Sequence, residues 1–153
     1  MAAETPIVGS NANKSKMEPR MNTNEHEYSL NGKIVHGELA YRVLGQAMEV
    51  HNKLGAGFLE KVYENALMVA LKRENISAHQ QVPVKVLFDE VVVGEYMADI
   101  LVEDKLILEL KTADAITNIH RAQTINYLRA TKLHLAIILN FARPKLEYER
   151  IVL

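Results

Sequence analysis

Residues 91–111 read VVVGEYMADILVEDKLILELK, the segment with the clearest structural pattern in the chain. Two runs rich in aliphatic side chains, residues 91–102 and 105–111, flank a polar turn around Asp104. Alternating or β-branched runs on either side of a polar turn are typical of antiparallel strands. The stretch therefore predicts a β-hairpin within a larger sheet.

The second strand of this hairpin has two different faces. Its sequence, KLILELK, places only leucines on one face, because successive side chains of a strand point to opposite sides. The other face carries Glu109 and Lys111, whose side chains start about 7 Å apart at a rise of ~3.3 Å per residue. A strand this apolar is expected to be central in the sheet. Its charged residues would then be buried, and buried charges need polar or charged partners.

Asp99 lies among apolar neighbours on the first strand. A three-residue turn over residues 103–105 places Asp99 opposite Glu109, with both carboxylates on one face, whereas a two-residue turn separates them. Two carboxylates forced together repel each other, and a divalent cation between them removes that cost. Ligands that are all oxygen favour Mg²⁺ or Mn²⁺ over zinc. An exposed ion pair between Glu109 and Lys111 is the alternative interpretation of the same spacing.

Helical patterns precede the hairpin and follow it. Apolar residues recur at helical spacing over residues 38–53 and 58–74, with Gly55 and Gly57 between the two segments. These segments predict an N-terminal helical hairpin. The expected inward stripe of the second helix is Leu59, Val62, Tyr63, Ala66, Leu67 and Ala70.

The remaining segments complete one domain. Residues 82–88 predict a strand before the hairpin, residues 118–130 a helix after it, and residues 134–140 and 146–153 two further strands. The order ααβββαββ favours an α+β fold with a mixed central sheet. Residues 1–33 are polar and lack apolar periodicity, so we expect a disordered tail there and a single domain over residues 34–153.

Composition excludes several classes of protein. The chain has no Cys, which excludes disulfides and thiolate-held metals and fits a reducing compartment. No apolar run approaches the ~20 residues that cross a bilayer, so we expect a cytosolic protein without a membrane segment. The net charge is −1, but the part from Lys111 onward carries +4. That asymmetry marks either a phosphate-facing side or an ordinary solvated surface.

Four motifs occur in an order that resembles a known superfamily. They are GFLEKVY at residues 57–63, ADILVEDKLILELK at 98–111, HRAQTINYL at 120–128 and ILNF at 138–141. An Asp on one strand followed by Glu-x-Lys on the next resembles the PD-(D/E)xK nucleases, and GFLEKVY matches the motif of the GxxExxY family within them. One departure is Ala98, which stands where the superfamily's name has Pro.

The resemblance implies a restriction-endonuclease-like α-β-β-β-α-β core that hydrolyses phosphodiester bonds of DNA or RNA with Mg²⁺ or Mn²⁺. Carried over to this chain, Asp99 and Glu109 hold the metal, and the carbonyl of Leu110 is a further ligand. Glu60 adds a carboxylate directly or through water. By itself, a carboxylate in the first turn of a helix also gains from the helix dipole.

The resemblance also assigns roles around the metal. Lys111 serves the attacking water and the transition state, while Gln123 and Tyr127 support the site from the following helix. Buried side chains of this type need polar partners, which an active site or an ordinary polar network can supply.

Two further expectations concern partners. The alternative to a nuclease is a non-catalytic nucleic-acid-binding or assembly module that keeps the fold, because the net charge is not basic. We also expect a homodimer, since two-fold dimers are common and a pair of small nucleases can span a duplex.

Overall fold

In a computed structural model, residues 29–30 and 33–153 are described. The expected disordered tail over residues 1–33 lies almost wholly outside the described residues. Its described part contributes to two short antiparallel strands, β1 (Ser29–Leu30) and β2 (Lys33–Ile34), which pair with each other.

The domain has the predicted order of helices and strands. They are α1 (Gly37–Leu54), α2 (Glu60–Arg73), β3 (Ala78–Phe88), β4 (Val91–Val102), β5 (Leu106–Lys111), α3 (Asn118–Thr131), β6 (Leu135–Asn140) and β7 (Glu147–Val152). Strands β3 to β7 form one sheet in chain order, antiparallel except for β5 and β6, which α3 connects as a parallel pair. The predicted α+β fold with a mixed sheet is confirmed. No helix in the described ranges is long and apolar enough to span a membrane.

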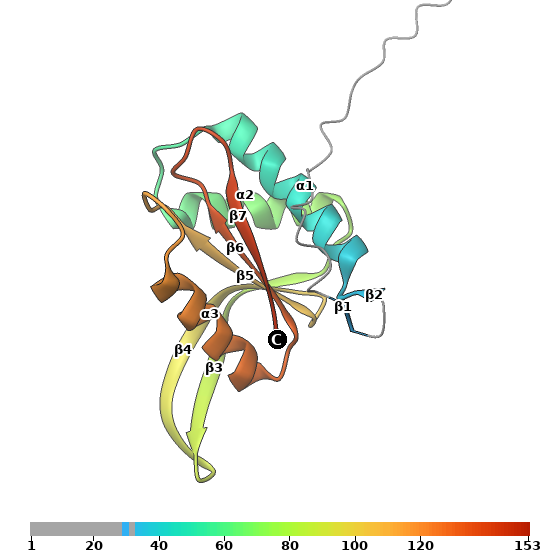
Figure 1. Ribbon diagram of the computed structural model, residues 1–153. Coiled ribbons are helices and arrows are strands. Elements are labelled where there is room, and N and C mark those ends of the chain that lie inside the picture. Colours follow the sequence, from blue (N-terminus) through green and yellow to red (C-terminus); the bar gives the residue numbers. More distant parts are fainter. Residues whose placement is uncertain (1–28, 31–32) are drawn as a thin grey trace, which may run out of the picture.

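The sheet is covered on both faces (Figure 1). The helices α1 and α2 pack on one face, over a core that includes the three leucines of β5. The helix α3 packs on the other face, where Tyr127 and Leu128 belong to the same buried cluster as Ile107 of β5. Strand β5 is therefore central and its backbone is buried, as its apolar sequence predicts.

The predicted inward stripe of α2 is partly wrong. Leu59 is 75% exposed and Val62 is 41% exposed, while Glu64 is only 3% exposed. The rotation of α2 follows from Tyr63, whose ring stacks on Phe141 at 4.4 Å between centroids. With Tyr63 directed into the core, the next residue along the helix also turns inward. Glu64 is therefore buried and Val62 faces outward.

The turn between β4 and β5 has three residues, the longer of the two alternatives that the sequence left open. Val102 pairs with Leu106, so residues 103–105 form the connection. Glu103 and Asp104 both adopt left-handed backbone conformations, with φ of 52° and 54°. Two successive residues of this kind match the twist of antiparallel strands. This turn sets the register on which the position of Asp99 depends.

A kink in the β3–β4 hairpin interrupts the strict alternation expected along β4. Ile100 packs in the α1/α2 core, but Ala98 packs in the α3 core, although strict alternation places residues two apart on one face. Gln81, on the neighbouring strand, has φ of 51°, a left-handed conformation that costs about 1 kcal/mol for a residue other than Gly. The distal part of the hairpin rotates at this point and continues as an arm beyond the body of the domain (Figure 1).

Burial predicts effects of very different size for two valine substitutions in helices. Val43 of α1 is 0% exposed, so Val43→Ala should lower the free energy of unfolding by about 2 kcal/mol through lost apolar burial and the cavity left behind. Val69 of α2 is 71% exposed, and Val69→Ala should change it by less than about 0.5 kcal/mol. Urea denaturation followed by circular dichroism measures both. Equal losses would contradict this arrangement of the core.

Candidate active site

Asp99 and Glu109 meet where the ladder between β4 and β5 ends. The last paired residues of this ladder are Ile100 and Leu108, so the register places Asp99 opposite Glu109. Beyond this last pair, hydrogen bonds from backbone N–H groups to side chains replace the backbone–backbone hydrogen bonds of the ladder. The Leu110 N–H donates to Asp99 Oδ2 at 2.7 Å, and the Asp99 N–H donates to Glu109 Oε1 at 3.3 Å. Both carboxylates therefore lie in the opening between the two strands.

The backbone of Leu110 faces the same opening. The N–H and C=O groups of one residue in an extended strand point to the same side, and the Leu110 N–H points toward β4. On its other edge β5 stays paired with β6 as far as Lys111 and Asn140. The carbonyl of Leu110 thus adds a third oxygen-bearing group on the edge of β5 that faces β4, where the two carboxylates lie.

Burial and repulsion disfavour ionisation of both carboxyl groups. Burial, followed by the charge of Asp99, raises the pKa of Glu109 to about 8. Burial also raises the pKa of Asp99, and the charges of Glu64 and Glu60 add to that effect. The hydrogen bond from Leu110 and the charge of Lys111 oppose it only in part. The pair is therefore poorly neutralised by the protein itself.

Lys111, Gln123 and Tyr127 form a hydrogen-bonded chain beside the carboxylates. Lys111 Nζ donates to Gln123 Oε1 at 3.2 Å, and Gln123 Nε2 donates to the Tyr127 hydroxyl at 3.0 Å. Burial, followed by the charge of Glu109, raises the pKa of Tyr127. The structure thus brings together the lysine of β5 and the two predicted residues of α3.

Glu64 is a carboxylate that the sequence interpretation missed. It is 3% exposed and accepts hydrogen bonds from Gln80 Nε2 at 2.9 Å, Gln81 Nε2 at 3.0 Å and Lys61 Nζ at 3.0 Å. Its charge raises the pKa values of both carboxyl groups in the opening, which places it near them. The signal was its position directly after the core residue Tyr63.

Glu60 is the first residue of α2 and is partly exposed. Its charge raises the pKa of Asp99, but less than the charge of Glu64 does. Glu60 is therefore close enough to the site for its charge to affect Asp99. Its role as a ligand stays a prediction.

The GFLEKVY motif fixes the loop that leads into α2. The Tyr63 hydroxyl donates to the Gly55 carbonyl at 2.6 Å and accepts from the Phe58 N–H at 3.2 Å. Gly57, with φ of 114°, adopts a conformation that side chains rarely allow. These contacts define where α2 starts, and so where its two glutamates lie relative to the sheet.

The ILNF motif fixes the loop after Lys111. Asn140 is fully buried, and its Nδ2 donates to the Ala113 carbonyl and to Glu147 Oε2, each at 2.8 Å. Its Oδ1 accepts from the Ala113 N–H at 3.1 Å. Asn140 is therefore a structural residue that holds the end of β5.

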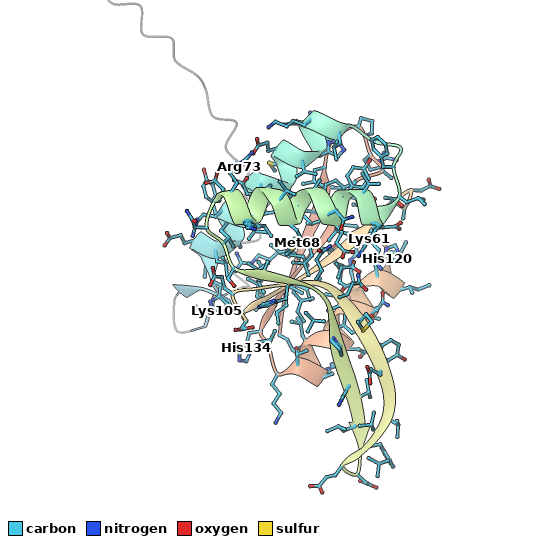
Figure 2. The ribbon with its side chains drawn as sticks, turned by 180° about the vertical axis from the view of Figure 1, so that it is seen from behind. Lys61, Met68, Arg73, Lys105, His120 and His134 are labelled. Atoms are coloured by element: carbon cyan, nitrogen blue, oxygen red, sulfur yellow. The ribbon has the colours of Figure 1, made fainter. Side chains whose placement is uncertain are left out.

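The helix α3 begins beside the same site. Thr117 and His120 form a capping box, in which each side chain accepts a hydrogen bond from the other's backbone N–H. Burial, followed by the charge of Lys111, lowers the pKa of His120. Figure 2 shows His120 and Lys61 at the same edge of the molecule in that view, where α3 and α2 begin. The effects of Glu60 on the pKa of Asp99 and of Lys111 on the pKa of His120 indicate that both helices start near the site.

Residues 37–151 match a family described as the PD-(D/E)XK nuclease superfamily. The chain belongs to this superfamily. No curated protein and no solved structure matches the chain. Asp99 and the triplet Glu109-Leu110-Lys111, which the sequence resemblance assigns to the D and (D/E)XK positions, meet at the open end of the ladder.

The residues of a PD-(D/E)XK site suit a hard divalent cation. Among residues 29–30 and 33–153, no three His, Cys, Asp or Glu side chains form a group that could hold a metal ion. Mg²⁺, however, commonly uses only one or two carboxylates and completes its shell with water and phosphate oxygens. Asp99 and Glu109, crowded and resisting ionisation together, fit that requirement. The Leu110 carbonyl adds an oxygen of the same chemical kind.

The raised pKa of Glu109 predicts a pH-dependent stability in the absence of metal. Unfolding returns this carboxyl group to its ordinary pKa of 4.5, whereas the folded value is about 8. Between these pH values the folded state holds the extra proton. Raising the pH should therefore lower the free energy of unfolding of the wild type relative to Glu109→Gln, by at most about 1.4 kcal/mol per pH unit.

Urea denaturation in EDTA at pH 5 and pH 8 measures this difference. The exposed residue Glu95 of β4 offers the matched control, and Glu95→Gln should follow the wild type at both pH values. A wild type and a Glu109→Gln variant with the same pH dependence would show that Glu109 is not buried beside a second carboxylate.

Proposed function

We propose that this PD-(D/E)XK protein is a divalent-metal-dependent nuclease that hydrolyses phosphodiester bonds of DNA or RNA. One observation carries the proposal. Asp99 and Glu109 lie together at the open end of a buried ladder, and Lys111 follows on the same strand. Membership of a nuclease superfamily supports the same chemistry.

The proposed metal ligands are Asp99, Glu109 and the carbonyl of Leu110. When bound there, Mg²⁺ or Mn²⁺ would neutralise charge on a phosphate oxygen and lower the pKa of an attacking water. Glu60 is proposed to contribute through water. Glu64, held by two glutamines, adds negative potential that attracts a cation to the pair.

Lys111 is the proposed cationic catalytic residue. In the free protein its ammonium donates to Gln123, which keeps it beside the carboxylates. From there it can donate to a phosphate oxygen and stabilise the negative charge that develops there in the transition state. Gln123 and Tyr127 are proposed positioning residues, because they hold Lys111 through a hydrogen-bonded chain.

The family assignment within the superfamily is part of the proposal. Gly57, Glu60 and Tyr63 of the GxxExxY motif shape the start of α2, and this supports the narrower family. The expected cytosolic location stays a prediction.

We also propose a homodimer. The tip of the β3–β4 arm exposes large apolar side chains, with Leu87 60%, Phe88 68% and Val91 62% exposed. Exposed apolar patches of this kind commonly mark protein interfaces. Sedimentation at micromolar concentration should show a dimer, and a monomer at every concentration would remove this part of the proposal.

Purified protein should cleave labelled nucleic acid in Mg²⁺ or Mn²⁺ and not in EDTA. Single- and double-stranded DNA and RNA are tested separately. Glu109→Gln removes a metal ligand and Lys111→Ala removes the cation, so each should slow cleavage by roughly 100-fold or more. Gel electrophoresis of the products measures the rate.

The matched controls are Glu95→Gln and Lys72→Ala, which change exposed residues outside the site. Both should cleave at the wild-type rate. Cleavage that survives in Glu109→Gln and in Lys111→Ala would exclude this site as its source. Salt-dependent binding without turnover in any divalent metal would favour the non-catalytic binding module instead.

A further inference from the structure

The segment that contains α3 has no acidic side chain. Residues 115–146 hold five Lys and Arg residues and no Asp or Glu, although the whole chain has a net charge of −1. Arg121 is neutralised by Glu149 of β7, with 2.6 Å between Nε and Oε1. Arg129 and Lys132, at the end of α3, make no ion pair with any residue that the structure describes. Positive charge is therefore concentrated at one end of this helix.

A groove of about 850 Å³ lies between α3 and the β3–β4 arm. Gln123 and Tyr127, which belong to the hydrogen-bonded chain of the active site, line it, and Arg129 and Lys132 line it as well. Figures 1 and 2 show the arm curving past α3 and away from the α1/α2 layer. The groove thus joins the active site to the cationic end of α3.

The groove combines cations with an accessible aromatic ring. Tyr96, on the wall formed by the arm, is 51% exposed, and its ring centroid lies 6.0 Å from that of Tyr127. Asn126 adds an exposed amide from α3. None of the residues that line the groove is acidic. This chemistry complements a polyanion that carries aromatic groups.

We propose that this groove binds single-stranded nucleic acid and leads its backbone to the active site, an inference that rests on the proposed nuclease function. Arg129 and Lys132 contact phosphates, and the exposed ring of Tyr96 stacks on a base. A base inside a duplex has its faces covered by its neighbours, so stacking on a protein ring requires an unstacked base. The combination of a basic groove and an aromatic platform is typical of binding without sequence preference.

Binding is measured with the full chain in EDTA, where metal-dependent cleavage cannot proceed. Fluorescence anisotropy compares labelled single-stranded DNA, single-stranded RNA and duplex DNA of one sequence over a range of salt concentrations. Single strands should bind more tightly than the duplex. The two single-stranded probes share phosphates and base faces, and their comparison distinguishes DNA from RNA as the preferred strand.

Two substitutions test the groove. Tyr96→Leu should weaken single-strand binding at least about fivefold through lost stacking. Arg129→Ala should weaken it and reduce the slope of log K against log salt by about 0.7, which corresponds to one lost phosphate contact. The controls Tyr41→Leu and Lys72→Ala alter exposed residues of α1 and α2 and should change affinity less than twofold. All four variants should keep the thermal unfolding transition of the wild type.

The inference is overturned if duplex binds as tightly as single strands, or if Tyr96→Leu and Arg129→Ala bind like their controls. Cleavage in Mg²⁺ separates this failure from failure of the proposed function. Metal-dependent cleavage together with unchanged binding in both groove variants would support the proposed nuclease function and reject the groove as the binding site. Binding that both variants weaken, without cleavage of any probe, keeps the groove as a binding site and removes the nuclease.

Discussion

The repulsion between Asp99 and Glu109 is the constraint on which the rest of the site depends. The two carboxyl groups share a partly buried opening in a sheet. Burial raises both pKa values, and the charge of Asp99 raises that of Glu109 further. Such a pair costs stability in a protein without a ligand. A divalent cation neutralises the two carboxylates, and the relief of their repulsion contributes to the free energy of metal binding. The proposed function follows from this exchange.

The surrounding fold holds the pair together by geometry at three places. The three-residue turn after Val102 sets the register between β4 and β5, and so brings the two carboxylates opposite each other. The left-handed conformation of Gln81 rotates the hairpin at the level of Asp99, and its amide binds Glu64. Tyr63 sets the rotation of α2 by stacking on Phe141. Backbone strain at Gln81 is thus located beside the proposed active site, where such strain commonly concentrates.

Much of this arrangement was predictable because it follows from local periodicity. The order of elements and the central position of β5 follow from strand alternation and apolar content. The alignment of Asp99 with Glu109 also required a three-residue turn, a length that the sequence left open. The burial of Glu64 and the change of face at Ala98 were not predictable in the same way. They depend on contacts between distant segments, namely the stacking of Tyr63 on Phe141 and the kink opposite Asp99. The periodicity of α2 or of β4 alone does not reveal the Tyr63–Phe141 stacking or the kink opposite Asp99.

A manganese soak of crystals of the wild type and of Asp99→Asn tests directly the proposal that Asp99, Glu109 and Leu110 bind a divalent cation. We expect an anomalous peak in the wild type within roughly 2 Å of carboxylate oxygens of Asp99 and Glu109 and of the Leu110 carbonyl oxygen. We expect a weak peak or none in Asp99→Asn, since one of the charges that attract the cation is gone. A wild-type crystal at saturating manganese without density between these groups, or a peak unchanged in the variant, would contradict the proposal.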